Sequence, residues 1–220
     1  MSTKKCKPIA KYPINVRDTG YGVVGRAPLI CGGINKDWDR DQSECFVYDQ
    51  ASNSWKLHAT LKRPRCCHAS VVVDGSLWLL AGMDNHEVKS TEIVLSDGNV
   101  EQGPDLPFER QGSCAVKLSN DRVMIIGGGK SVRNDDTMFN VTIFDIGSTT
   151  FTTGPRPQYG RYYAACAVFN SPLHGNRPVV VVAGGNHYYG APNVRNSEVL
   201  DYTNPNANWE ICKCCSLYNF

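Results

Sequence analysis

PLICGGINKDWDRDQSECFVYDQASNSWKLHATLKRPR, residues 28–65, is the stretch that decides the fold. It contains an apolar run ending in Gly32-Gly33, a polar loop, an alternating run ending in Tyr48-Asp49, a turn, and Trp55. Short apolar runs bounded by glycine and polar turn residues are typical of antiparallel strands. The stretch therefore predicts a small, strand-rich unit.

Three looser copies of this unit follow it, at intervals of about 50 residues, which is the range of kelch-type repeats. Each copy has an apolar run ending in glycine, at Gly82, Gly127-Gly128 and Gly184-Gly185. A second apolar run and a turn come next in every copy. The chain is therefore expected to be a repeat protein in which each unit forms a four-stranded sheet.

The units resemble kelch repeats, whose pattern places a glycine pair before a later Tyr and Trp. The first unit matches closely through Gly32-Gly33, Tyr48-Asp49 and Trp55. The other three keep parts of the pattern: Gly82, Leu95 and Val100 in the second, Gly127-Gly128, Phe144-Asp145 and Phe151 in the third, Gly184-Gly185, Asp201-Tyr202 and Trp209 in the fourth. The resemblance covers roughly residues 20–213.

This resemblance implies an all-β, kelch-type β-propeller with about four four-stranded blades. We place the blades at residues 20–61, 68–107, 113–157 and 163–213, with a tail at 214–220. Residues 1–19 are expected to include the outer strand of a preceding blade. Since kelch propellers resemble closed rings of about five to seven blades, four blades predict an incomplete ring or open arc. Its open edges predict self-association.

Charge and hydropathy limit the partners. A net charge of +2 predicts no nucleic-acid binding, and no apolar run is long enough to predict a membrane span. The first residues lack the apolar core of a signal peptide. We therefore expect a cytoplasmic protein, or an extracellular one if the natural N-terminus lies upstream.

No catalytic, cofactor-binding or metal-binding residue is predicted. Residues 20–25 spell G-x-G-x-x-G, but the expected next element is a strand, whereas a dinucleotide site requires a helix. Gly129-Lys130-Ser131 resembles the end of a phosphate-binding loop, again without a helix. The five histidines fall in different blades and loops, where nothing in their spacing implies convergence on a metal.

Cysteine use stays open. Cys31 and Cys45 are expected to face each other across two antiparallel strands, either as a disulfide or as two buried thiols. Cys66-Cys67, Cys114 and Cys166 recur near the starts of successive inner strands, where small residues suit a crowded axis.

The functional expectation comes from topology. If the strands of a blade are a to d from the axis outward, the b-to-c and d-to-a loops emerge on one face. These loops carry the candidate partner-binding residues: Trp38, Arg63, Arg65, Arg110, Arg133, Arg161, His187, Tyr188 and Tyr189. Arginine and exposed aromatics are typical of binding hot spots, and the basic bias predicts an acidic peptide as partner.

A scaffold role is the alternative for three of these residues. Arg65, Arg110 and Arg161 recur at equivalent places, as in kelch relatives, whereas Trp38 and Arg63 do not recur. The resulting prediction is a non-enzymatic kelch-repeat module that binds another protein. Two alternatives remain: a kelch-propeller enzyme, such as a copper oxidase resembling galactose oxidase or a sugar-processing enzyme, and a partial gene product without independent function.

Overall fold

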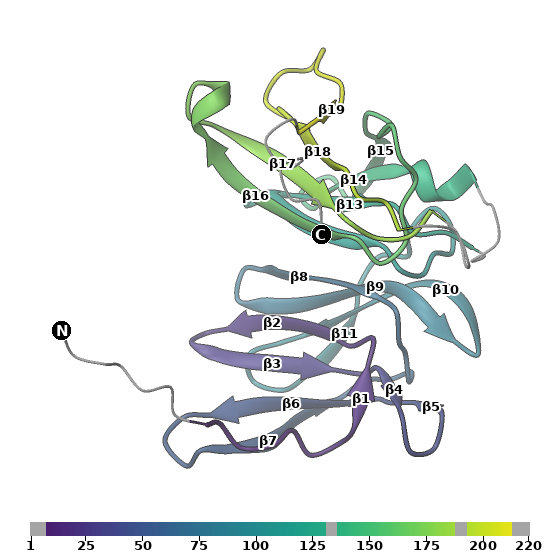
Figure 1. Cartoon of the computed structure of the whole chain (residues 1–220). Coiled ribbons are helices and arrows are strands. Elements are labelled where there is room, and N and C mark those ends of the chain that lie inside the picture. The colour runs from purple at the N-terminus through teal and green to yellow at the C-terminus, as the bar shows by residue number, and fades with distance from the viewer. Residues whose placement is uncertain (1–7, 131–135, 188–192, 213–220) are drawn as a thin grey trace.

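The computed structural model describes residues 8–130, 136–187 and 193–212 (Figure 1). The described chain consists of antiparallel strands and two 3-10 helices, Asp136–Phe139 and Pro172–His174. None of its helices is long and apolar enough to cross a membrane. The predicted all-β class is therefore confirmed.

Sixteen of the strands form four sheets of four, each in up-and-down order. The sheets are β2 (Gly20–Val24), β3 (Ala27–Cys31), β6 (Glu44–Asp49) and β7 (Ser54–Thr60); β8 (Ala69–Val73), β9 (Ser76–Asp84), β10 (His86–Val94) and β11 (Val100–Gln102); β12 (Cys114–Ser119), β13 (Arg122–Ile126), β14 (Val141–Asp145) and β15 (Thr150–Thr153); β16 (Ala165–Ser171), β17 (Arg177–Ala183), β18 (Ser197–Leu200) and β19 (Glu210–Ile211). We call these sheets blades one to four. In Figure 1 blade one lies at the bottom, blade two lies above it, and blades three and four lie together at the top.

A fifth, three-stranded sheet lies in the connection between β3 and β6. It pairs β1 (Val16–Arg17) with β4 (Ile34–Asn35), and β4 with β5 (Arg40–Asp41). The b-to-c loop of blade one is therefore a structured hairpin held against the segment that precedes the blade.

The hydrophobic core lies between successive blades. In β3, Leu29 and Cys31 point to one side and pack with Leu77 and Leu79 of β9, because alternate residues of a strand face the same side. Glycine lets the innermost strands of blades one and two approach closely: a Cβ at Gly22 would lie 2.5 Å from a methyl carbon of Val72 in β8. Because the apolar side chains are buried between blades, we expect that no blade is stable alone.

The glycine pairs join each blade to the next. In three repeats the second glycine donates its N–H to the carbonyl of a buried arginine: Gly33 to Arg65 (2.9 Å), Gly82 to Arg110 (2.8 Å) and Gly128 to Arg161 (2.8 Å). The first position of the pair has a left-handed backbone, with φ of 66° at Gly127 and 59° at Ala81. The second repeat thus keeps the turn although alanine replaces glycine.

Among the residues that the structure describes, two disulfides are seen. Cys31–Cys45 joins β3 to β6 within blade one, which is the first of the two arrangements that the sequence left open. Cys114–Cys166 links the innermost strands of blades three and four, with Cα atoms 6.1 Å apart. The second bond was not predicted, because the recurring cysteines were interpreted only as small residues near the axis.

Both end blades expose apolar side chains on the faces that point away from their neighbours. In β2, Tyr21 and Val23 are 70% and 59% exposed, and in β16, Phe169 is 47% exposed. Residues 8–13 form no strand, and Tyr12 packs edge-on against Phe46 and Trp55 of blade one. The N-terminal segment thus covers part of the outer face of this blade.

Candidate functional site

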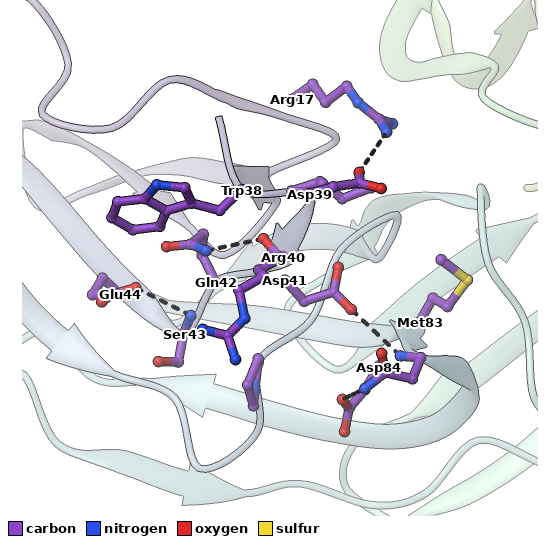
Figure 2. Close-up of a pocket in the computed structure, with 13 residues that line it drawn as sticks. Arg17, Trp38, Asp39, Arg40, Asp41, Gln42, Ser43, Glu44, Met83 and Asp84 are labelled. Carbon is purple, nitrogen blue, oxygen red and sulfur yellow. Dashed lines mark hydrogen bonds and ion pairs between the residues drawn. The ribbon is translucent and has the colours of Figure 1, made fainter. Parts of the chain in front are cut away.

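A groove of about 800 Å³ lies where blades one and two meet. It is lined by the b-to-c hairpin of blade one, by Pro64 of the following d-to-a loop, and by the b-to-c turn of blade two at residues 83–85. Figure 2 shows Trp38 at one end of the groove and Asp84 at the other. In an up-and-down blade, b-to-c and d-to-a loops emerge on the same face, as expected for the walls of one groove.

The hairpin between β4 and β5 positions Trp38. Asn35 pairs with Arg40 across this hairpin, and its side-chain oxygen accepts the backbone N–H of Asp37 at 2.8 Å. Asp39 has a left-handed backbone (φ 48°), which reverses the chain. The indole is left 71% exposed, so the hairpin presents a large aromatic side chain to solvent.

Two polar contacts hold the walls of the groove together. Arg63 forms an ion pair with Asp84, with both Nε and Nη2 at 3.2 Å from the carboxylate. On the hairpin side, Asp41 accepts the backbone N–H of Asn85 at 3.4 Å. Arg63 therefore lies beside the groove, but its charge is already matched by a carboxylate of this chain.

The lining carries four acids and two arginines: Asp39, Asp41, Glu44, Asp84, Arg17 and Arg40. Among the described residues, neither Asp41 nor Glu44 has a cation within ion-pair distance. Arg17 pairs with Asp18 and lies 4.0 Å from Asp39. The balance of charge in the groove is therefore negative, contrary to the basic surface expected from the sequence.

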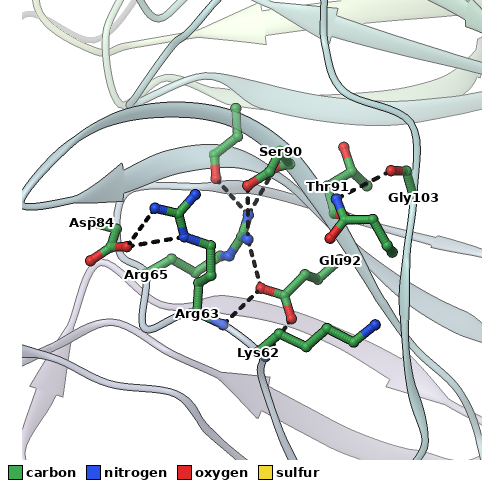
Figure 3. Close-up of polar contacts among 10 residues, drawn as sticks. Lys62, Arg63, Arg65, Asp84, Ser90, Thr91, Glu92 and Gly103 are labelled. Atoms are coloured by element: carbon green, nitrogen blue, oxygen red, sulfur yellow. Dashed lines mark hydrogen bonds and ion pairs between the residues drawn. The ribbon is translucent and has the colours of Figure 1, made fainter.

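Arg65, Arg110 and Arg161 do not belong to this surface. Each is at most 1% exposed. The guanidinium of Arg65 donates to the carbonyls of Ala81 and Ser90 at 3.1 and 2.9 Å, and to Glu92 at 2.7 Å (Figure 3). Burial lowers the pKa of Arg65. The structure thus assigns these arginines the scaffold role, and their place among the binding residues is corrected.

The acids that hold these arginines were missed by the sequence reasoning. Glu92 also accepts the backbone N–H groups of Lys62 and Arg63, and Glu198 does the same for Gln158 and Tyr159. Glu198 accepts Arg161 at 2.9 Å. The available signal was an acid at the same place in the third strand of blades two and four.

Blade three lacks this acid. Thr142 occupies the corresponding position, and its hydroxyl accepts Nη2 of Arg110 at 2.8 Å. The ring of Phe108 lies 4.3 Å from the guanidinium carbon. Burial alone lowers the pKa of Arg110 to about 10, because no described carboxylate offsets the loss of water.

Three candidates, Arg133, Tyr188 and Tyr189, lie outside the described residues. His187 is half-buried in the b-to-c loop of blade four, between β17 and β18. Its Nδ1 lies 3.1 Å from the Gly160 carbonyl, and its ring meets Phe139 edge-on at 5.7 Å. His187 is thus tied to the scaffold and stands apart from the groove lining.

The glycine motif at residues 20–25 lies in β2 and the turn after it, and the next element is β3. Ser131 of the second glycine motif lies outside the described residues. In the part of the chain that the structure describes, no three His, Cys, Asp or Glu side chains are grouped to hold a metal.

Comparisons with known proteins agree with this architecture. No family model matches the chain. It is 24% identical over 119 residues to kelch repeat and BTB domain-containing protein 1 of cowpox virus (strain GRI-90 / Grishak), covering 52% of this chain and 20% of that protein. Beta-scruin of Limulus polyphemus is 31% identical over 100 residues, covering 40% and 11%. Kelch-like protein 41a of Danio rerio is 22% identical over 127 residues, covering 57% and 21%.

The chain therefore spans about a fifth or less of the length of these curated relatives. The solved structure of YjhT superposes with a TM-score of 0.73 at 14% identity, covering 93% of this chain and 67% of that one. The resemblance to kelch repeats and the four-bladed propeller fold are confirmed.

Proposed function

We propose that this kelch-repeat β-propeller chain is a non-enzymatic interaction module that binds a segment of another protein in the groove between blades one and two. The observation that carries the proposal is Trp38, 71% exposed at the edge of that groove. A solvent-exposed Trp beside a concave surface is typical of a binding hot spot. Several relatives are named for kelch repeats together with a BTB domain, which fits a module within a larger protein.

The construction of the groove favours a partner segment over a small molecule. Its walls come from two different blades, and the hairpin that carries Trp38 is held by pairing with β1. Trp38 and Arg63 have no counterparts in the other repeats, and such loop residues on a rigid scaffold are suited to specificity. The lining is largely polar and charged, as the rim of a protein interface is.

The sign of the partner's charge depends on the groove lining. An acidic peptide was expected from a set of arginines, of which Arg65, Arg110 and Arg161 are buried with partners of their own. Arg63 remains on the surface, paired with Asp84. We therefore still propose a protein partner bound at the loop face, and we infer the charge of this partner from the residues that line the groove.

A phage-displayed peptide library tests the proposal. Peptides selected on the wild-type chain are measured for affinity against Trp38→Ala and, as a matched control, Leu173→Ala. Leu173 is 77% exposed in the connection between β16 and β17, away from the groove. We expect at least about tenfold weaker binding for Trp38→Ala only. The melting temperature should hold, since exposed substitutions change stability by about 0.5 kcal/mol or less. Equal binding by all three proteins would place the site elsewhere.

We also propose that the end faces of the arc associate with further copies. The support is the exposure of Tyr21, Val23 and Phe169 on unpaired blade faces, because open sheet surfaces of this kind invite association. Sedimentation velocity at increasing concentration should show a growing apparent mass. A monomer at all concentrations up to about 10 mg/ml would contradict this.

A further inference from the structure

We propose that Cys66 and Cys67 form a dithiol site that undergoes reversible thiol–disulfide exchange with a low-molecular-weight disulfide. In this site Cys67 is the attacking thiol and Cys66 is the resolving thiol. Both side chains lie behind the wall of the groove between blades one and two, so the site is separate from the proposed peptide-binding surface.

The two thiols lie at the junction of blades one and two. Both are buried, with 0% and 7% of their surface exposed, and they pack with Ile34 and Met83. These two apolar side chains line the groove (Met83 in Figure 2). Cys66 and Met83 also exchange two backbone hydrogen bonds, of 3.0 and 2.9 Å. A small reagent in the groove is therefore separated from the thiols by this apolar wall.

The pair remains reduced although four other cysteines of the described residues form disulfides. Neighbouring Cα atoms lie about 3.8 Å apart across a trans peptide, below the range of about 4.4–6.8 Å that is usual for a disulfide. A bond between the two sulfurs would therefore be strained and easily reduced. This favours a pair that cycles between dithiol and disulfide over a permanent structural bond.

Hydrogen bonds distinguish the two thiols. The hydroxyl of Tyr163 donates to the sulfur of Cys67 at 3.6 Å. The S–H group of Cys66 donates to the same sulfur, and this contact raises the pKa of Cys66 and lowers the pKa of Cys67. Because the thiolate is the nucleophile in disulfide exchange, two donors directed at one sulfur make Cys67 the attacking residue.

Three charged side chains also face Cys67. Asp18 and Asp41 repel a thiolate there and act to raise its pKa. Arg17, which lines the groove, attracts the thiolate. The two hydrogen bonds outweigh the repulsion, since the pKa of Cys67 is lowered in spite of burial.

The exchange takes place in two steps. The Cys67 thiolate attacks one sulfur of the reagent, whose S–S bond breaks as a mixed disulfide forms, and the first leaving thiolate takes up a proton from solvent. Cys66 then attacks the Cys67 sulfur, gives its proton to the second leaving thiolate, and closes a Cys66–Cys67 disulfide. The reagent is reduced by two electrons to two thiols, and the pair is oxidised by the same two electrons.

Mass spectrometry of one tryptic peptide tests the proposal. Trypsin cleaves after Arg65 and Lys89, so the peptide of residues 66–89 carries this pair and no other cysteine. The folded full chain is incubated with oxidised glutathione, trapped with iodoacetamide and digested. We expect the peptide to lose two hydrogen atoms, and to recover them in reduced glutathione that leaves Cys114–Cys166 intact. A peptide that keeps both thiols in the folded chain but is oxidised in urea would overturn the proposal.

Serine variants separate the two roles. In Cys66→Ser the reaction should stop at the mixed disulfide, so glutathione remains attached to Cys67. In Cys67→Ser the first attack is lost, and addition of glutathione to Cys66 should be at least about tenfold slower. Equally fast addition to the two variants would overturn the assignment of attacking and resolving thiol.

Tyr163→Phe tests the positioning of the attacking sulfur. In the Cys66→Ser background it should slow formation of the mixed disulfide about threefold and move the pH midpoint of the reaction upward. The matched control is Tyr21→Phe, which is 70% exposed on the free face of blade one and should leave both quantities unchanged. An unchanged rate and midpoint in Tyr163→Phe would refute the role of Tyr163 as a donor to the thiolate.

Discussion

Glu198→Gln should destabilise the fold by about 4 kcal/mol, because it leaves the buried guanidinium of Arg161 without a negative charge. Glu198 is fully buried and accepts three hydrogen bonds, from Arg161 at 2.9 Å and from the backbone N–H groups of Gln158 and Tyr159 at 2.6 and 3.2 Å. Glutamine keeps the shape but replaces one acceptor oxygen by a donor. At least one of the three donors then loses its partner.

The magnitude follows from these contacts. Removing one member of a buried ion pair costs about 3–5 kcal/mol, and hydrogen bonds to a charged group contribute about 1.5–3 kcal/mol each. The assay is urea unfolding under non-reducing conditions, followed by circular dichroism. With a slope of about 3 kcal/mol per molar urea, the midpoint should fall by roughly 1.3 M. A loss below about 1 kcal/mol would refute the view that this carboxylate balances a buried charge.

Blade three provides the reciprocal experiment. Arg110 is as buried as Arg161, but Thr142 stands where Glu198 stands in blade four. Thr142→Glu should therefore stabilise the chain by about 1–2 kcal/mol. The gain is smaller than the loss in Glu198→Gln because the hydroxyl contact and the ring of Phe108 must give way. If Thr142→Glu destabilises, Phe108 already compensates the charge of Arg110.

Three further outcomes are expected. In urea unfolding, Gly127→Ala should lower the free energy of unfolding by about 2 kcal/mol more than Gly25→Ala does. The two glycines have similar φ (66° and 64°), but only a Cβ at Gly127 would lie 2.4 Å from a backbone oxygen. Equal losses for the two variants would show that this close approach has no effect on stability. The double variant Cys114→Ala, Cys166→Ala should have a free energy of unfolding about 4 kcal/mol lower than the wild type, because this disulfide closes a 52-residue separation. Reducing agent should then destabilise the variant less than it destabilises the wild type. Burial lowers the pKa of His68 to about 3, so its contribution to stability is present above pH 6.5 and is lost as pH falls toward 3. In His68→Asn, the free energy of unfolding should therefore change less with pH between 6.5 and 3 than in the wild type. An unchanged pH dependence would contradict this.

The fold could be predicted because the repeat contains residues that determine the backbone conformation. Gly127-Gly128 adopts left-handed φ and lets the backbone of the next blade approach, and no side chain could replace that feature without strain. Ala81 adopts the same conformation without being glycine, which is why the second repeat looked degenerate. A sequence pattern contains the residue that is most frequent in this conformation, which is glycine, whereas the structure shows that alanine adopts it too.

The candidate site was harder to predict because neighbouring side chains of one loop go to different places. Arg63 and Arg65 are two residues apart, yet Arg63 reaches outward to Asp84 and Arg65 inward to Glu92. Strict alternation would put both on one side, but the loop around Pro64 has no sheet partner to enforce it. Only the location of the matching acids, 21 and 27 residues further along, separates the two.

A residue that recurs in successive repeats can nevertheless be recognised as a scaffold residue when the residue that contacts it recurs as well. An arginine that recurs beside a recurring acid can form the same buried pair in each blade, so its charge is not available to a ligand. Glu92 and Glu198 repeat in this way, and the surface charge must therefore be counted without their arginines. Counted so, the loop face loses its basic character at the groove, whose lining carries four acids and two arginines. A charge expected of a partner must for that reason be inferred from the residues that line the groove and not from the recurring arginines.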